Sequence, residues 1–378
     1  MDFNLSDSQK MLQNMVKEIA LKEVAPRAAE VDRTGSFPLE NVKVLAKYNL
    51  LGVPFPVEYG GAGADMVSYA ITIEELAQVC ASTAFICAVH AVPAFCLQLS
   101  GSEEQKRRYL TQLANGSKLG AFALTEPNAG SDAAAIQTEA KLEGDEYVLN
   151  GSKCFITNAG YADIYVVFAS TDKSKGARGI SAFIVERGVK GLSFGRIEDK
   201  LGLRGSANGE VLLRDCRIPK ENLIGREGEG LRIALAALDR ARIGGAALGV
   251  GIAQAALNAA KDYAKKRVQF GQPIANLQAI QFMIADMATR VEAARLLTYR
   301  AARLADEGKR FTREAAMAKL YASEVAMKVT VDAVQIHGGY GLSKDWPVER
   351  YMRDAKAVAI IEGTSEIQRL VIARSELA

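Results

Sequence analysis

The chain is poor in the residues that bind transition metals. It has only two histidines, His90 and His337, and five cysteines, none of them in a C-x-x-C pair. Because zinc sites need clustered Cys and His ligands, we expect no metal site. The cysteines lie mostly in apolar surroundings and are predicted to be buried thiols in a reducing compartment: Cys80, Cys87, Cys96, Cys154 and Cys216.

An excess of one charge is also missing. Lys and Arg total 47 against 44 Asp and Glu, which gives a formal net charge of +3, and no basic block stands out. A nucleic-acid partner is therefore not expected. Residues 1–7 have neither the basic nor the apolar region of an export signal. We predict a cytoplasmic protein, with a processed mitochondrial matrix form as the alternative.

One segment is close to a membrane helix in composition. Ile243–Ala260 is rich in Ala, Gly, Val and Leu, but Gln254 and Asn258 interrupt it and charged residues flank both ends. Small residues also allow the helices of soluble proteins to pack closely. We therefore predict a buried helix and no membrane insertion.

Hydrophobic periodicity divides the 378 residues, 49% of them hydrophobic, into three parts. Helical spacing predicts an N-terminal helical domain over residues 1–118, with helices at Met11–Val24, Val42–Leu51 and Tyr69–Val79. β-rich runs predict a middle sheet domain over 119–225, with strands at Gly120–Thr125, Tyr147–Phe155, Ile164–Ala169, Ile180–Val185 and Gly209–Leu213. Long periodic stretches predict a C-terminal helical domain over 226–378, with helices at Leu231–Arg267, Gln278–Asp306 and Thr312–Gln335. The fold class is mostly α with a central β domain.

No G-x-G-x-x-G motif follows a first strand, and strands do not alternate regularly with helices. A doubly wound dinucleotide-binding fold is therefore excluded. A flavin site would have to be built in another way.

The strongest candidate for catalysis is Glu362, which lies between the apolar run Ala357–Ile361 and a helix start capped by Thr364 or Ser365. Burial against the apolar run would raise the pKa of its carboxyl toward the range of a general base. Gly363 beside it would let a ligand approach the backbone. The alternative is a carboxylate favoured by the positive helix end, which would lower the pKa instead.

Several segments resemble acyl-CoA dehydrogenases in order and spacing over nearly the whole chain. They are Leu124–Asp132 (LTEPNAGSD), Phe155–Asn158 (FITN), Arg267–Gly271 (RVQFG), Gln335–Gly339 (QIHGG), Met352–Ala355 (MRDA) and the Glu362 segment Ile360–Gln368. The resemblance, nearest to the short-chain (butyryl-CoA) branch, implies an N-terminal helical domain, a middle β-barrel or sheet domain and a C-terminal four-helix bundle. It also implies FAD, with the flavin ring between the sheet and the C-terminal helices.

The family's FAD contacts carry over to matching positions. The flavin pyrimidine edge and pyrophosphate would be bound by the turn after the first strand, through Phe122, Leu124, Thr125, Gly130 and Ser131. Phe155 would cover one face of the flavin, at a position where the family more often has Trp. Thr157 would bind near N5 of the flavin, and Ile156 lies between these two contacts. Without the resemblance, the segment from Phe122 to Ser131 would be interpreted as a surface turn, and Phe155 would be interpreted as an aromatic residue of the core.

A second group would bind the FAD of a neighbouring subunit: Arg267, Phe270, Gln278, Gln335, Gly338 and Gly339. Thr364 and Glu366 would contact the nucleotide end. Read alone, Arg267 is a cation favoured at a helix C-terminus. Sharing of FAD between subunits implies a homotetramer arranged as a dimer of dimers.

For the substrate, the resemblance places Asp239 and Arg242 along the CoA path, and Ser131 and Gly363 near the thioester. Read alone, Asp239 and Arg242 belong to a solvated helix face. Ile361 stands where straight-chain members usually carry Tyr, which favours a branched or alicyclic acyl group.

The acyl pocket is expected at Phe85, Val89, His90 and Phe95, whose bulk favours a short chain. For His90 itself a packed helix histidine is the preferred expectation, with a polar pocket residue as the alternative. No Arg near Ala84 could pair with a distal carboxylate, which argues against glutaryl-CoA.

The implied reaction is α,β-dehydrogenation. Glu362 would remove the α-proton of the acyl-CoA while the β-hydride passes to flavin N5, giving a trans-2-enoyl-CoA, and electron-transferring flavoprotein would reoxidise the flavin. Some relatives carry the base at a different position, which corresponds to Ala241 in this chain. Alanine has no group that accepts a proton, so Ala241 cannot be the base. The alternatives are an acyl-CoA oxidase and, from another class, a catalytically silent CoA-ester-binding or assembly protein.

Overall fold

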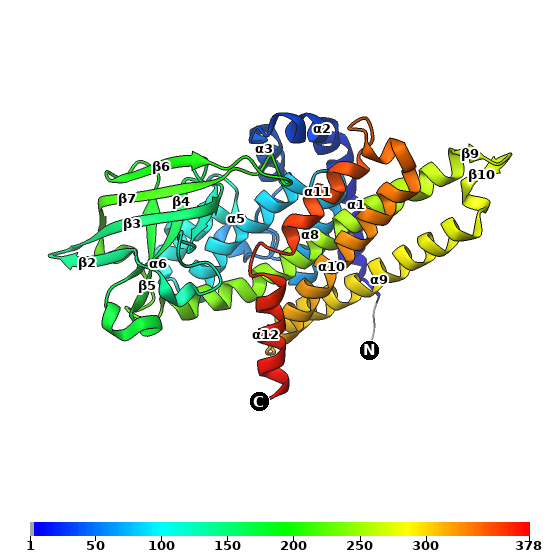
Figure 1. The fold of residues 1–378 in the computed structure, drawn as a ribbon. Coiled ribbons are helices and arrows are strands. Elements are labelled where there is room, and N and C mark those ends of the chain that lie inside the picture. The colour runs from blue at the N-terminus through cyan, green and yellow to red at the C-terminus, as the bar shows by residue number, and fades with distance from the viewer. Residues whose placement is uncertain (1–3) are drawn as a thin grey trace.

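The computed structural model describes residues 4–378 and places a sheet at one end of a long helical body (Figure 1). The N-terminal helices are α1 (Asp7–Ile19), α2 (Ala25–Thr34), α3 (Leu39–Lys47), α4 (Met66–Val79), α5 (Ala81–Ser100) and the short α6 (Glu103–Gln105) and α7 (Thr111–Ala114). The predicted helix Val42–Leu51 is wrong at its C-terminal end. Asn49 adopts a φ of 54°, so the chain turns there and buries Leu50 and Leu51.

The middle part forms an eight-stranded sheet in the order β6-β7-β3-β2-β4-β5-β8, with β1 beside β4. Its strands are β1 (Gly120–Ala123), β2 (Glu139–Glu143), β3 (Glu146–Thr157), β4 (Ile164–Ser170), β5 (Ile180–Glu186), β6 (Leu192–Ile197), β7 (Asn208–Pro219) and β8 (Leu223–Ile224). The β1–β4 pair is parallel, and β3 pairs antiparallel with both β2 and β7.

β4 is buried on both faces. Val166 and Phe168 belong to the core shared with the helices, whereas Tyr165 and Val167 belong to a separate core within the sheet domain. Alternate side chains of a strand point to opposite faces, so a strand between two cores is apolar throughout. β4 therefore joins the sheet to the helical body.

The C-terminal helices are α8 (Gly230–Lys266), α9 (Gln278–Asp306), α10 (Thr312–His337), α11 (Val348–Val358) and α12 (Ser365–Glu376), with a hairpin of β9 (Val268–Gln269) and β10 (Gln272–Pro273) between α8 and α9. α8 runs through the centre and contacts α4, α5, α9 and α10. A Cβ on Gly249 would lie 3.1 Å from the Ala322 carbonyl oxygen, so small residues bring α8 close to α10. The predicted fold class, mostly α with a central β domain, is confirmed.

α5 and α8 are each long and apolar enough to cross a membrane by length and composition, but most of each apolar stretch is buried inside the protein. That burial is typical of core helices. Four of the cysteines are buried, Cys154 is half-buried, and all five are free thiols. Within residues 4–378, no group of three or more His, Cys, Asp or Glu side chains could hold a metal ion.

Candidate active site

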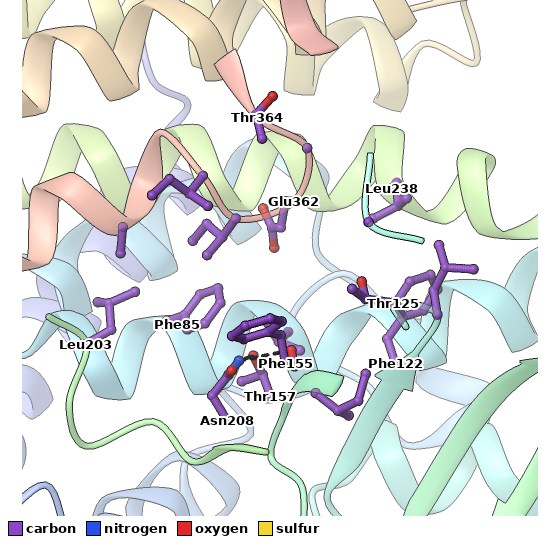
Figure 2. A pocket seen from close by; sticks show the side chains of 18 of the residues that line it. Phe85, Phe122, Thr125, Phe155, Thr157, Leu203, Asn208, Leu238, Glu362 and Thr364 are labelled. Carbon is purple, nitrogen blue, oxygen red and sulfur yellow. Dashed lines mark hydrogen bonds between the residues drawn. The ribbon is translucent and has the colours of Figure 1, made fainter. Parts of the chain in front are cut away.

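A cavity of about 530 Å³ lies where the ends of β1 and β3, the loop Lys200–Leu203, α8 and the α11–α12 connection meet (Figure 2). Its walls are mostly apolar, with a few polar side chains, which is typical of a small-molecule site. The structure brings many of the predicted site residues together here: Phe122, Leu124, Thr125, Gly130, Ser131, Phe155, Ile156, Thr157, Arg242, Ile361, Glu362, Gly363 and Thr364.

The Glu362 carboxylate points into this cavity and faces Phe155 across it (Figure 2). Both carboxylate oxygens are buried and have no hydrogen-bond partner among residues 4–378. Burial raises the pKa of Glu362 to about 7, against the opposing effects of the Lys319 and Arg242 cations. Desolvation therefore outweighs the two cations, and the carboxyl has a pKa suited to a general base.

The backbone at Glu362 is held in an uncommon conformation. Glu362 has a φ of 55° and Gly363 a φ of 96°. Thr364, rather than Ser365, caps α12, since its side chain accepts from the Ile367 amide at 3.3 Å. Phe155 and Leu203 also have positive φ, at 55° and 50°, and line the same cavity. Left-handed conformations of non-glycine residues cost free energy and cluster at functional sites.

The turn after β1 is fixed by a buried ion pair that the sequence analysis missed. Lys153 Nζ lies 2.7 Å from Glu126 Oε1 and donates to the Leu124 carbonyl oxygen at 3.1 Å. Glu126 also accepts from the Thr138 amide at 3.0 Å, and its own backbone exchanges two 3.1 Å hydrogen bonds with Ala129. A buried charged pair of this kind, fully hydrogen-bonded, rigidifies the segment that carries Thr125 and the residues after it.

At the end of β3, the Phe155 ring is 63% exposed. The Asn208 side chain supports this strand end, because its Nδ2 donates to the Phe155 carbonyl at 3.0 Å and to Thr157 Oγ1 at 3.2 Å. Thr157 Oγ1 accepts in that bond, so its own proton is free to be donated elsewhere. The site thus offers an aromatic face and a hydroxyl donor on one wall.

The loop Lys200–Leu203 forms another wall and was not predicted. Asp354 of α11 accepts from the Leu203 amide at 2.6 Å. Its neighbour Arg353 holds both carboxylate oxygens of Asp32, at 2.9 and 2.6 Å, and so ties α11 to α2. Burial raises the pKa of Asp354 to about 7. The MRDA segment, Met352–Ala355, therefore holds the loop that forms this wall of the cavity.

The residues predicted for the substrate are only partly at the cavity. Arg242 lines it and is paired with Asp239, Nη1 to Oδ1, at 2.6 Å. Asp239 does not line it and instead accepts from Thr312 Oγ1 at 2.6 Å. The reading of these two residues as a solvated helix face is wrong, since the Arg242 side chain is only 6% exposed.

Of the residues expected at the acyl pocket, Phe85 and Val89 line the cavity, whereas Phe95 packs between Phe55 and Tyr69. His90 is fully buried. Its Nδ1 accepts from the Gly120 amide at 3.0 Å, so Nε2 carries the proton and donates to the Leu113 carbonyl, also at 3.0 Å. The pocket position for His90 is wrong, and the packed helix histidine is right.

The second predicted group lies apart from this cavity, toward the far end of the helical bundle: Arg267, Phe270, Gln278, Gln335, Gly338 and Gly339. Glu366 is in the first turn of α12, four residues after Glu362, and does not line the cavity itself. Phe270 is 88% exposed at the tip of the β9–β10 hairpin (Figure 1). Gln278 begins α9, and Gly338 ends α10 with a φ of 59°. Within one chain these residues do not line the cavity that holds Glu362.

Three family models match successive parts of the chain. They are the acyl-CoA dehydrogenase N-terminal domain over residues 6–117, the middle domain over 121–216 and the C-terminal domain over 228–377. The short-chain specific acyl-CoA dehydrogenase of Clostridium acetobutylicum is 53% identical and is covered over 98% of both chains.

Solved structures agree. Butyryl-CoA dehydrogenase from Megasphaera elsdenii is 48% identical, with a TM-score of 0.99 over the whole of both chains. A structure described as the electron transferring flavoprotein of Acidaminococcus fermentans contains a chain that is 51% identical, also with a TM-score of 0.99 and full coverage. With all three family models matched and relatives this similar over its whole length, the chain belongs to the acyl-CoA dehydrogenase family.

Proposed function

We propose that this protein is an FAD-dependent oxidoreductase that converts a short-chain acyl-CoA to its trans-2-enoyl-CoA, with Glu362 as the base. One observation carries the proposal: a buried carboxylate without hydrogen-bond partners among residues 4–378 points into an apolar cavity. Similarity to short-chain and butyryl-CoA dehydrogenases supports the substrate class. A scaffold or silent binding protein would have no need of a desolvated carboxylate at this place.

The cavity residues fit a flavin. The exposed Phe155 ring offers a flat apolar surface, and Thr125 and Thr157 offer hydroxyl groups. A Cβ on Gly130 would meet no atom within 4 Å, so the turn backbone is open to a ligand. The residues that would hold the flavin end are Phe122, Leu124, Thr125, Gly130, Ser131, Phe155, Ile156 and Thr157, with Thr364 and Glu366 toward the nucleotide. When bound, FAD supplies the acceptor for the hydride that leaves the β-carbon.

The chain's own part is to position the thioester and take the proton. Glu362 in its carboxylate form accepts the α-proton of the acyl group and becomes neutral. The Glu362 amide donates to no other protein group in the described chain, so it is available to the thioester carbonyl and to the negative charge that develops there. The apolar walls exclude water, which strengthens both interactions. Ser131, Arg242 and Gly363 would line the path of the CoA ester.

The size of the acyl group is limited by Phe85 and Val89, which line the cavity. Their bulk favours a short chain. Ile361 lies next to the base and also lines the cavity. Because a branched aliphatic side chain stands there, a branched or alicyclic short acyl group is the second candidate.

We propose electron-transferring flavoprotein as the electron acceptor. The chain that is 51% identical and belongs to a structure described for such a flavoprotein supports this. We further propose a cytoplasmic homotetramer, a dimer of dimers, in which Arg267, Phe270, Gln278, Gln335, Gly338 and Gly339 bind the FAD of a neighbouring subunit. Domain boundaries at 118/119 and 225/226 are proposed on the change from helices to strands and back.

The test is an anaerobic titration of the purified, FAD-loaded protein. Butyryl-, hexanoyl-, isobutyryl-, 2-methylbutyryl- and cyclohexanecarboxyl-CoA are added while the flavin absorbance is followed, with Glu362→Gln in parallel. Bleaching by butyryl-CoA that is lost in the variant supports the function and the base. Preference for a branched or ring ester supports the second candidate. Bound FAD without bleaching by any ester would overturn both, and rapid reaction of the bleached flavin with oxygen would indicate an oxidase.

A further inference from the structure

Lys319 on α10 is a fully buried lysine beside the candidate base. Its side chain is among the largest with no measurable exposure, and its Nζ donates to the Gly363 carbonyl oxygen at 2.7 Å. Burying an ammonium group is costly unless it is well bound. Among residues 4–378 it forms no ion pair within 4.0 Å, so its charge is not neutralised by a direct partner.

The bond from Lys319 fixes the peptide that follows the base. The same Gly363 carbonyl also accepts from Gln368 Nε2 at 2.9 Å, so two donors hold one oxygen. Glu362 is in the left-handed region, a conformation that its surroundings must enforce in a residue other than glycine. A Cβ on Gly363 would lie 2.8 Å from Gln368 Nε2, which shows how closely the donor approaches.

The charges around Glu362 single out Lys319. Three titratable groups from three helices face its carboxylate: Arg242 on α8, Lys319 on α10 and Tyr69 on α4. Only the two cations lower the pKa of Glu362. Arg242 is already paired with Asp239 at 2.6 Å. Lys319 has no such partner, and its attraction to Glu362 is the first of the two effects that lower the pKa of the carboxyl. Burial lowers the pKa of Lys319 itself to about 8, so at neutral pH it is still mostly charged.

We propose that Lys319 is the positioning residue of the reaction proposed above: it holds the Glu362–Gly363 turn so that the carboxylate faces the cavity, and its charge keeps Glu362 ionised. The inference rests on Glu362 being the base. Without the ammonium group, only Arg242 would oppose the effect of burial, and more of the carboxyl would be in the neutral form, which cannot accept a proton. Proton transfer to Glu362 then leaves Lys319 charged and bound to Gly363.

The hydrogen bond and the charge make separate contributions. Lys319→Met removes both and places an apolar side chain of similar length in a buried site. Lys319→Gln removes the charge and keeps a donor. Lys328→Met is the matched control, since Lys328 is on the same helix, is 55% exposed and pairs with Asp332.

The first readout needs no substrate. Infrared difference spectra recorded over pH follow the protonated carboxyl band of Glu362, identified by its loss in Glu362→Gln. Both Lys319 variants are expected to move the midpoint of this band upward by about one pH unit or more. The control is expected to leave it in place.

The second readout is the pH dependence of anaerobic flavin reduction. The midpoint is expected to move upward as in the infrared titration. The rate of flavin reduction on the high-pH plateau is also expected to fall in Lys319→Met, because the Lys319 hydrogen bond no longer holds the turn. The fall should be smaller in Lys319→Gln, which keeps a donor.

An unchanged infrared midpoint in folded Lys319→Met or Lys319→Gln would overturn the inference. If Lys319→Met fails to fold, Lys319→Gln carries the same test. A wild-type protein that is not bleached by any acyl-CoA would instead refute the proposed function, while the infrared titration would still report on Lys319.

Discussion

Gly245 on α8 leaves the space that the Glu362 carboxylate occupies. A Cβ added to Gly245 would lie 2.4 Å from Glu362 Oε2, closer than any van der Waals contact allows. The next atom of the carboxyl group, its carbon, would be 3.5 Å away. The absence of a side chain in the middle of a buried helix is therefore part of the geometry of the base.

Gly245→Ala is expected to separate activity from stability. The added methyl pushes the carboxylate aside, and a displacement of about 1 Å can cost about a hundredfold in rate. Alanine is favoured over glycine inside a helix by about 1 kcal/mol, so the melting temperature should hold or rise. The measurement is the rate of anaerobic flavin bleaching beside thermal melting of the FAD-loaded protein.

Gly249→Ala is the matched control one turn along the same helix. Its Cβ would meet the Ala322 backbone oxygen at 3.1 Å instead of the Glu362 carboxylate. We expect lower stability from the crowding of α8 against α10, with the bleaching rate of the folded protein retained. Equal loss of activity in both variants would contradict a specific role for the space at Gly245.

The sequence could indicate Glu362 as a candidate base because the pattern is local there: an apolar run, a carboxylate, a glycine and a helix cap follow one another. The long periodic helices α8, α9 and α10 were predicted close to their observed bounds for a similar reason. α5 was missed because it is apolar on all sides and lacks the one-sided pattern of a surface helix. β6 was missed because it is largely exposed and has little apolar alternation.

The supporting groups could not be read from the sequence, because each depends on a contact between distant segments. Lys153 looks like an ordinary strand lysine until its partner Glu126, 27 positions away, is brought beside it. Asp354 and Leu203 are 151 positions apart. Lys319 meets Gly363 across 44 positions. Tertiary packing creates these bonds, and no local sequence pattern predicts them.

Glu362→Gln is expected to stabilise the protein above neutral pH. Burial raises the pKa of this carboxyl from 4.5 to about 7 in the folded state. The folded state therefore favours the neutral form, and stability is lost as pH rises from the unfolded pKa through the folded one. That loss amounts to about 3 kcal/mol above pH 7. Glutamine stays neutral and avoids it.

The measurement is thermal melting of wild type and Glu362→Gln at about pH 5 and about pH 9. The two proteins should melt at similar temperatures at the lower pH, with the variant higher at the upper one. A pH-independent difference would mean that the carboxyl titrates in its ordinary range and is not desolvated in solution. The bleaching rate of the wild type should rise over the same window, because only the ionised form is a base.

Asp354 is expected to act through the loop that it holds. Asp354→Ala leaves the buried Leu203 amide without an acceptor, at a cost of about 1–3 kcal/mol, and loosens the cavity wall. We expect weaker binding of the CoA ester and a lower melting temperature. Asp354→Asn is the control, since it keeps an acceptor oxygen and removes the charge. It should bind normally and gain stability above pH 7, where the wild-type carboxyl is ionised at a cost.

Arg267 tests whether FAD is shared between subunits. It lies at the end of α8, packs over the Tyr340 ring with its guanidinium carbon 5.6 Å from the ring centre, and does not line the Glu362 cavity. If it binds the pyrophosphate of a neighbour's FAD, Arg267→Ala should lower FAD retention by about tenfold or more, since charge-assisted bonds contribute about 1.5–3 kcal/mol. Retention is measured by the free FAD recovered after dialysis.

Because Arg267 does not line the Glu362 cavity, Arg267→Ala is expected to leave that cavity intact. Lys265→Ala, two positions earlier and exposed on the same helix end, is the control for loss of positive charge and should keep its FAD. Light scattering then reports the oligomeric state of each variant. Loss of FAD with the tetramer retained would indicate a contact made across the interface, whereas a monomer that holds FAD as tightly as the wild type would refute sharing.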